Sequence, residues 1–248
     1  MIKSNSDLII IKNPKSRFAE AIKTLRTNLA FSNVDKDSKF ILVTSCEPGA
    51  GKSFISANLA VAFSQENKKV LIIDCDMRKG RQHTIFNVPN KPKGGYSSLI
   101  LNYREDVKKS SRFNDYLDEE FNFKNYILPT PLSNIDIITS GPIPPNPTEL
   151  LASLNNERIL KKVSEMYDVV ILDCPPVIGM SDAAIMTKFS DVNLLVVSNK
   201  STKIEEVNMA KKIFQTVNSE INGVILNKVN MKHSTYGGYY GGYYGDDK

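Results

Sequence analysis

The stretch Cys46-Glu-Pro-Gly-Ala-Gly-Lys-Ser53 decides the fold that this sequence predicts. It is preceded by the apolar run Phe40-Ile-Leu-Val-Thr44, which is typical of a buried strand, and is followed by a helical pattern over 51–65. The P-loop pattern requires a glycine, four variable residues, Gly-Lys and then Ser or Thr, and here Cys46 replaces only the first glycine. Backbone N–H groups at a helix N-terminus attract phosphate oxygens. The stretch therefore predicts a nucleotide-phosphate site between a strand and a helix.

Each residue type in this loop fits a part of a bound nucleotide. The Lys52 ammonium is expected to neutralise the β- and γ-phosphates, and the Ser53 hydroxyl is expected to bind Mg²⁺. The alternative is a glycine-rich turn with an exposed lysine, and the flanking strand and helix argue against it. The residues expected to bind the nucleotide are Pro48, Gly49, Ala50, Gly51, Lys52, Ser53 and Phe54.

Acidic residues follow two further apolar runs. Asp74 and Asp76 come at the end of the second run, and Asp173 ends a later one in a Walker B pattern. Two buried carboxylates this close would repel each other unless a cation or a shared proton lay between them. Solvated loop acids are the alternative for the first pair. Because a Walker B aspartate holds Mg²⁺ directly or through a water, the predicted metal ligands are Ser53, Asp76 and Asp173.

Short apolar runs alternate with helical patterns through most of the chain. This alternation predicts an α/β fold with a mostly parallel central sheet and helices on both faces, of the P-loop NTPase type. Ligands of such sheets bind at the carboxyl ends of the strands, so the three motifs should meet at one edge. The strands are expected at 40–44, 70–74, 135–139, 168–173, 193–197 and 224–227, and the helices at 51–65, 149–153, 157–166, 182–189 and 204–217.

One polar stretch, 91–130, interrupts this alternation. It is rich in Lys, Asn, Ser and aromatic residues, and it holds only weak helical signals over 96–103 and 113–121. We expect it to be an insertion on the nucleotide face and not a second domain. A single P-loop domain is therefore predicted over 1–235.

Composition narrows the class of protein. The 248 residues are 41% hydrophobic and 24% charged, which supports a packed core and argues against a wholly disordered chain. Three cysteines do not make a disulfide framework, and no apolar run approaches the roughly 20 residues of a membrane helix. Residues 1–14 lack the pattern of a signal peptide. We expect a reduced, cytoplasmic protein.

The two ends of the chain differ in character. Residues 1–39 hold eight Lys or Arg and four Asp or Glu, but no nucleic-acid motif accompanies this charge, so no nucleic-acid partner is expected. The last 13 residues hold five of the ten tyrosines, and the protein has no tryptophan. Glycines separate these tyrosines and no aliphatic residue lies among them. We therefore expect a flexible, exposed tail over 236–248.

Together these features resemble the bacterial tyrosine kinases of the capsule and exopolysaccharide type, in the form found as a separate cytosolic chain. That family carries a Walker A, an acidic Walker A′ and a Walker B motif, which match 46–53, 72–78 and 169–175. The resemblance also includes the run Gly141-Pro-Ile-Pro-Pro-Asn-Pro-Thr-Glu-Leu-Leu151 and covers nearly the whole chain except about 103–130. The family's C-terminal tyrosine cluster matches Tyr236, Tyr239, Tyr240, Tyr243 and Tyr244.

The resemblance implies a protein-tyrosine kinase that uses ATP and Mg²⁺ to phosphorylate this tyrosine cluster on a neighbouring subunit. Phosphoryl transfer depends on alignment and charge neutralisation. Lys52 and Mg²⁺ would cover the developing negative charge, and the catalytic Asp76 would organise the metal together with Ser53 and Asp173. Asp74 is the candidate base for the tyrosine hydroxyl, and Arg78 is expected to hold the phosphates or the incoming acidic tail. Asn227 resembles the residue that hydrogen-bonds adenine in related ATPases, although a strand-end cap explains it nearly as well.

The resemblance also implies partners. A Glu-x-x-Arg-x-x-Arg helix joins the family's subunits into a ring, and Glu20, Lys23 and Arg26 match it on a helix expected at about 16–31. Lys23 cannot form the two-pronged contact of arginine, and an ordinary charged helix face is the alternative. A membrane-anchored polysaccharide co-polymerase is implied as the activator that recruits the chain to the inner face of the plasma membrane, together with a cognate tyrosine phosphatase.

Two other functions compete with the kinase. Partitioning and positioning ATPases share the fold and the Walker B motif, but their signature lysine is replaced here by Glu47, which cannot neutralise a phosphate. A nucleotide-binding scaffold whose tail is modified by another kinase is the second alternative. Cys46, Cys75 and Cys174 each lie within one motif, and a zinc or redox site is the alternative to small residues that fill strand-end turns.

Overall fold

The computed structural model describes residues 7–32, 39–90, 94–110 and 125–230. Several sequence predictions lie outside these residues. They are the helical signal over 113–121 and all five tail tyrosines, together with the rest of the tail over 236–248.

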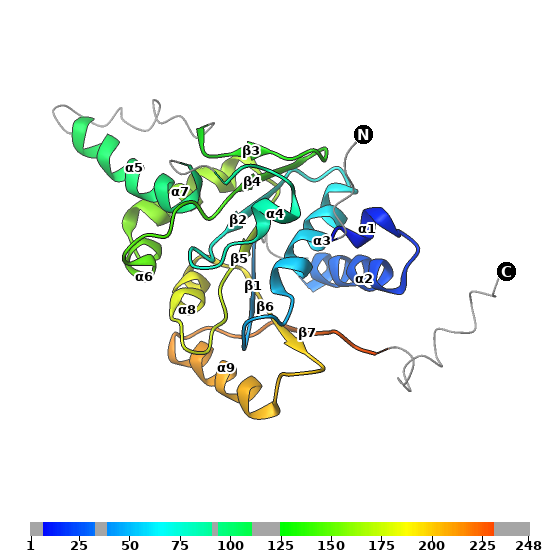
Figure 1. Ribbon diagram of the computed structural model, residues 1–248. Coiled ribbons are helices and arrows are strands. Elements are labelled where there is room, and N and C mark those ends of the chain that lie inside the picture. The colour runs from blue at the N-terminus through cyan, green and yellow to red at the C-terminus, as the bar shows by residue number, and fades with distance from the viewer. Residues whose placement is uncertain (1–6, 33–38, 91–93, 111–124, 231–248) are drawn as a thin grey trace.

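Within the described residues, seven strands form one sheet in the order β3-β4-β2-β5-β1-β6-β7 (Figure 1). Every neighbouring pair is parallel except β3 with β4, which is antiparallel. The mostly parallel α/β fold predicted from the sequence is confirmed, and β3, only two residues long, was not predicted. The strands are β1 (Phe40–Ser45), β2 (Val70–Asp74), β3 (Leu128–Pro129), β4 (Ile135–Ile138), β5 (Val169–Asp173), β6 (Val192–Ser198) and β7 (Gly223–Asn227).

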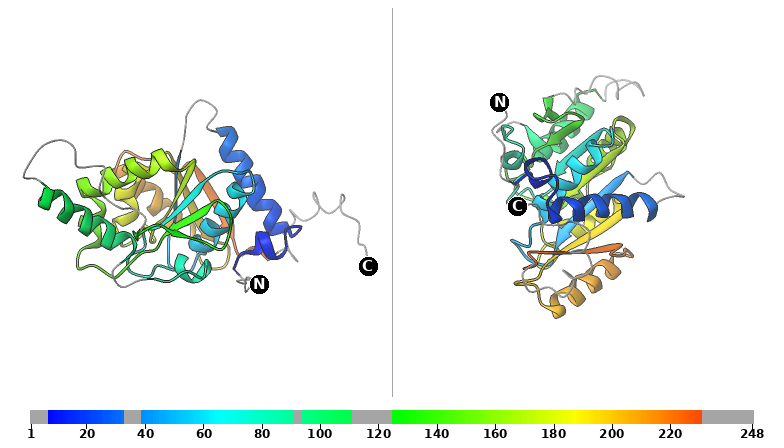
Figure 2. Two further views of the ribbon diagram at one scale, coloured as in Figure 1. Left: turned by 90° about the horizontal axis from the view of Figure 1, so that it is seen from above. Right: turned by 90° about the vertical axis from the view of Figure 1, so that its right-hand side faces the viewer.

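Helices cover both faces of the sheet. Successive side chains of a strand point to opposite faces, so a strand made of consecutive apolar residues needs burial on both sides. In β1, Ile41 and Val43 belong to one core cluster and Leu42, between them, to the other. The first cluster is completed by α1 (Ile9–Lys12), α2 (Arg17–Ser32), α3 (Lys52–Ser64) and α4 (Gln82–Ile85). The second is completed by α5 (Gly95–Ser110), α6 (Pro147–Leu151), α7 (Leu154–Met166), α8 (Asp182–Met186) and α9 (Ile204–Thr216). Figure 2 shows the two sets of helices on either side of the sheet.

Helix α3, which follows the P-loop, is buried on nearly every side. It packs on the sheet, and α1 and α2 cover its outer surface. Its sequence is rich in small and apolar residues, which allows close approach on both sides. The buried Asn58 accepts a hydrogen bond from the Ile10 backbone N–H at 3.1 Å and donates to the Asp7 carbonyl at 2.8 Å. The N-terminal segment therefore fixes the helix that presents the P-loop.

The polar stretch 91–130 begins with a helix that belongs to the core. Tyr96 and Leu99 of α5 are fully buried in the second cluster, and the Tyr96 backbone N–H donates to the Thr139 carbonyl at the end of β4. This part of the stretch covers one face of the sheet beside α7. Among the described residues, no helix is both long enough and apolar enough to cross a bilayer.

The junction of β4 and α5 gives a prediction about stability. Gly95 has φ +78°, and a Cβ there would lie 2.4 Å from backbone atoms of Gly141. Gly95→Ala should lower the free energy of unfolding by about 3 kcal/mol, since the strain of a positive φ adds to a clash that only the backbone can relieve. Gly179→Ala is the matched control, because Gly179 has φ +83° and open space around it, and should cost only about 1 kcal/mol. Denaturant unfolding measures both, and equal losses would show that the close contact is unimportant.

Candidate active site

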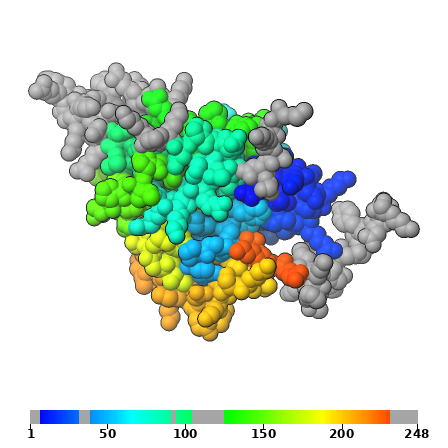
Figure 3. All heavy atoms as spheres, viewed as in Figure 1, coloured from blue at the N-terminus to red at the C-terminus, as the bar shows by residue number. Residues whose placement is uncertain are grey.

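The P-loop turns sharply between β1 and α3, and the last strand of the sheet holds it in place. Gly49 and Gly51 have φ +84° and +100°, which glycine adopts without strain. The Asn227 amide donates to the Ala50 carbonyl at 2.9 Å, and the Lys228 ammonium donates to the Gly49 carbonyl at 2.6 Å. Figure 3 shows the loop, in light blue, beside the end of β7, in orange-red. Here Asn227 contacts the loop backbone, and its contact with adenine stays a prediction.

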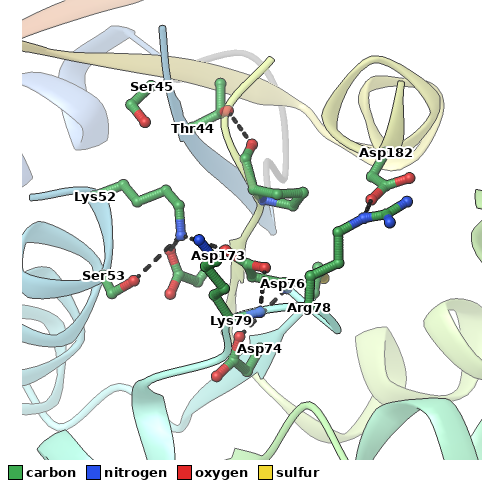
Figure 4. Close-up of polar contacts among 12 residues, drawn as sticks. Thr44, Ser45, Lys52, Ser53, Asp74, Asp76, Arg78, Lys79, Asp173 and Asp182 are labelled. Carbon is green, nitrogen blue, oxygen red and sulfur yellow. Dashed lines mark hydrogen bonds and ion pairs between the residues drawn. The ribbon is translucent and has the colours of Figure 1, made fainter. Parts of the chain in front are cut away.

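The three motifs meet at one edge of the sheet, as the sequence predicted. Asp74 of β2 lies in register opposite Asp173 of β5, and both side chains are fully buried. The Lys52 ammonium lies 3.0 Å from Asp76 Oδ2 and 3.8 Å from Asp173 Oδ1, and donates to the Ser53 hydroxyl at 3.4 Å. Figure 4 shows Lys52 pointing from α3 into this group of acids.

The charges at this edge shift the pKa values of its groups strongly. Burial alone would lower the pKa of Lys52, but Asp173, Asp76 and Asp74 more than offset that effect, so the pKa rises and the lysine stays charged. Burial and the neighbouring Asp173 carboxylate together raise the pKa of Asp74 well above its ordinary value. Its two oxygens accept from the backbone N–H groups of Gln82 at 3.0 Å and Asp76 at 3.3 Å. A carboxyl group with a raised pKa is suited to accept a proton.

Gln82 is a buried residue of this site that the sequence analysis missed. It is the first residue of α4, and its amide nitrogen donates to the Ser53 carbonyl at 3.0 Å and to Asp173 Oδ2 at 2.7 Å. A single glutamine after a basic loop carries no recognisable pattern, so only the folded chain could reveal it.

Arg78, predicted to be catalytic, points away from the acidic group in this structure (Figure 4). Its Nε atom lies 3.4 Å from Asp182 Oδ2, and Asp182 is 1% exposed at the start of α8. Asp182 also accepts a hydrogen bond from the Thr148 hydroxyl of α6. The sequence analysis gave no role to Asp182, and this pair holds Arg78 at the rim of the site.

Glu47, which stands where partitioning ATPases carry their signature lysine, is bound within its own chain. Its Oε1 accepts from the hydroxyls of Ser201 at 3.0 Å and Thr202 at 2.6 Å, in the loop between β6 and α9. The side chain therefore links the P-loop to a neighbouring loop of the same subunit.

The residues present fit a magnesium nucleotide. Among the described residues, no group of three or more His, Cys, Asp or Glu could hold a metal ion. Mg²⁺ is commonly held by one or two carboxylates together with phosphate oxygens and waters. Asp76 and Asp173 supply carboxylates on either side of Lys52, and Ser53 supplies a hydroxyl beside them.

The three cysteines are free and fully buried in the second core cluster. Burial and the neighbouring Glu47 raise the pKa of Cys46 to about 11, so its thiol stays protonated near neutral pH. Cys75 and Cys174 follow the paired Asp74 and Asp173 on adjacent strands, and burial raises the pKa of Cys75. These environments suit small residues that fill strand-end turns.

The predicted oligomerisation residues lie along α2 and have partners in their own chain. Lys23 donates to Glu20 at 2.7 Å and to the Pro14 carbonyl at 3.1 Å. Arg26 pairs with Glu66 at 2.7 Å and donates to the Ala62 carbonyl of α3 at 3.0 Å. Arg26 thus connects α2 to α3, and its contact with another subunit stays a prediction.

With this geometry in place, comparisons with known proteins identify the family. A family model described as an AAA domain matches residues 38–227. The chain is 40% identical to the tyrosine-protein kinase YwqD of Bacillus subtilis over 94% of this chain and 91% of that one. It is 31% identical to the tyrosine-protein kinase Etk of Escherichia coli over 95% of this chain but only 30% of that longer one.

Solved structures give the same result. The kinase domain of the Escherichia coli tyrosine kinase ETK matches with a TM-score of 0.81 at 30% identity, covering 95% of this chain and 85% of that one. The chimerical protein CapA2B2 matches with a TM-score of 0.79 at 38% identity, covering 90% of each. The septum site-determining protein MinD of Pyrococcus horikoshii, at 19% identity and a TM-score of 0.55, covers 76% of this chain and 69% of its own and shares the fold alone. The chain belongs to the bacterial tyrosine-protein kinases built on a P-loop AAA domain.

Proposed function

We propose that this chain is an ATP- and Mg²⁺-dependent autokinase that phosphorylates the C-terminal tyrosine cluster of a neighbouring subunit. The observation that carries the proposal is the convergence of Lys52, Asp76 and Asp173 beside the buried Asp74 at the P-loop. The kinase names of its relatives support the same chemistry. The activity would regulate capsular or exopolysaccharide synthesis and export.

Each residue has a part in the proposed transfer. When bound, Mg²⁺ would offset phosphate charge, and Ser53, Asp76 and Asp173 would hold it. Lys52 would leave its carboxylate partners to meet the β- and γ-phosphates. Asp74 would take the proton of the tyrosine hydroxyl, and Arg78, on the exposed rim, would meet the phosphates or the acidic end of the tail.

The end of β7, which precedes the tyrosine tail in the sequence, lies beside the P-loop. Lys228, just beyond β7, donates to the Gly49 carbonyl, and the described chain continues to Asn230. From there Tyr244 is 14 residues away, and a chain of that length spans at most about 50 Å when extended. A tail of this reach could enter the site of an adjacent subunit, which is the arrangement we propose.

The proposed assembly is a homo-oligomer, arranged as a ring, in which Glu20, Lys23 and Arg26 of α2 meet a neighbouring subunit. A membrane-anchored polysaccharide co-polymerase would activate the kinase and recruit it from the cytoplasm to the membrane. A cognate tyrosine phosphatase would reverse the modification. Phosphate groups on the tail would repel one another at a shared interface, which would loosen the ring.

The two competing functions predict different chemistry. A positioning ATPase would hydrolyse ATP without labelling protein, and here Glu47, which pairs with Ser201 and Thr202, stands at the position of its signature lysine. A scaffold would bind nucleotide and receive its tail phosphates from another kinase. Purified protein with no other kinase present separates all three.

Lys52→Met tests the catalytic site directly. With ATP and Mg²⁺, the intact protein should incorporate phosphate at Tyr236–Tyr244, mapped by mass spectrometry. Lys52→Met should lower the rate at least about 100-fold, because it removes the charge that stabilises the transferring phosphoryl group. Lys200→Met is the control at an exposed lysine and should label normally. Undiminished labelling of Lys52→Met would show that catalysis lies elsewhere.

Mixing two variants tests transfer between subunits. One protein carries Lys52→Met and an intact tail, and the other keeps Lys52 but has all five tail tyrosines changed to Phe. Neither should label alone, whereas the mixture should place phosphate on the Lys52→Met chain. The label should grow faster than in proportion to total protein concentration at low concentration. No label in the mixture, with normal labelling of the intact protein, would mean transfer within one chain.

Asp74→Asn should change how the stability of the nucleotide-free protein depends on pH. Because the folded pKa of Asp74 is raised, its charged form opposes folding above the ordinary aspartate pKa of about 4. Relative to the parent, the variant should therefore gain about 1 kcal/mol of stability as the pH rises from about 4 to about 8, while tail labelling falls sharply. Thermal unfolding at several pH values measures this. A difference in stability between variant and parent that does not change over this pH range would contradict it.

A further inference from the structure

Gln82 contacts all three motifs of the site. Its backbone N–H donates to Asp74 Oδ2 at 3.0 Å, in the Walker A′ motif. Its amide nitrogen donates to the Ser53 carbonyl of the P-loop at 3.0 Å and to Asp173 Oδ2 of the Walker B motif at 2.7 Å. The side chain is fully buried, so these bonds form away from water.

The orientation of the Gln82 amide follows from its partners. A carbonyl oxygen and an ionised carboxylate only accept hydrogen bonds, so the group facing Ser53 and Asp173 must be the NH₂ end. The amide oxygen then has no hydrogen-bond partner among the described residues, although it is buried. Buried polar groups of this kind are commonly satisfied by an ordered water.

The contact with Gln82 is the shortest that the described residues make to the Asp173 carboxylate. The other oxygen of Asp173 lies 3.4 Å from the Ser56 hydroxyl and 3.8 Å from the Lys52 ammonium. Both contacts are long, and that to Lys52 changes if the lysine turns to a phosphate. The direction of the Asp173 oxygens therefore depends mainly on Gln82.

We propose that Gln82 is a positioning residue for the magnesium ion, which sets the orientation of the Asp173 carboxylate through its amide hydrogen bond. The inference rests on the proposed Mg²⁺–nucleotide site but not on the identity of the phosphate acceptor. Side chains that orient a metal ligand typically change metal affinity by about 10- to 100-fold when removed. If Gln82 only joined α4 to the sheet, its loss would weaken nucleotide binding equally with and without the ion.

The test measures binding of a fluorescent ADP analogue to the full chain, with Mg²⁺ and in EDTA. Gln82→Met keeps the length of the side chain and removes both donors. Its affinity in EDTA should stay within about 2-fold of the parent, while the gain in affinity from Mg²⁺ should fall at least about 10-fold. Gln215→Met, at an exposed position of α9, is the matched control and should keep the full gain.

A second variant and a second readout keep the test decisive. Gln82→Leu should behave like Gln82→Met, and thermal unfolding identifies any variant that fails to fold. An unchanged magnesium gain in the folded variants would overturn the proposal, as would equal losses of affinity with and without Mg²⁺. If the variants lose the gain while the intact chain labels no tyrosine, the kinase proposal fails but the role of Gln82 stands. Absence of a magnesium gain in the parent chain would overturn both.

Discussion

The burial of several carboxylates around the Lys52 ammonium is the constraint on which the rest of the structure depends. Asp74 and Asp173 face each other across adjacent strands without exposure to water, and Asp76 lies close by. Carboxylates packed this closely repel one another strongly in the protein interior, where the dielectric constant is low. In the nucleotide-free chain, Lys52 is the counter-ion to Asp76 and Asp173. A phosphate that drew Lys52 away would leave these acids uncompensated unless Mg²⁺ replaced it, so we expect the binding of nucleotide and of metal to be coupled.

The fold holds these mutually repelling carboxylates together by fixing the strands and the helix that carry them. The register of β2 on β5 sets Asp74 opposite Asp173, and these strands lie in the middle of the sheet with apolar side chains on both faces. Helix α3 presents Lys52 and is itself held between the sheet and α2. Because the surrounding core is close-packed, the acids cannot move apart to relieve their repulsion. The electrostatic repulsion among the acids is thus retained at the site of the proposed chemistry.

The sequence predicted those features that depend on local pattern. The apolar strands, the P-loop and the convergence of Asp74, Asp76 and Asp173 follow from residue types at short spacing and from the rule that parallel strands share a carboxyl edge. Gln82 and Asp182 escaped prediction because their contacts join segments about 90 and 104 residues apart, which no periodicity reports. The sequence analysis assigned only a weak helical signal to the first turns of α5, because the segment has a polar composition. In the structure, Tyr96 and Leu99 of these turns are buried in the core. Tail phosphorylation and subunit contacts remain predictions.

Two sets of contacts join the P-loop to other parts of the chain. Asn227 and Lys228 bind the carbonyls of Ala50 and Gly49, and a Cβ on Gly51 would lie 2.2 Å from the Asn227 amide. Glu47 binds the loop between β6 and α9. A change in the conformation of the P-loop would therefore break or shift its contacts with the end of β7. The same contacts that shape the P-loop also hold the end of β7, after which the sequence continues to the proposed substrate tail.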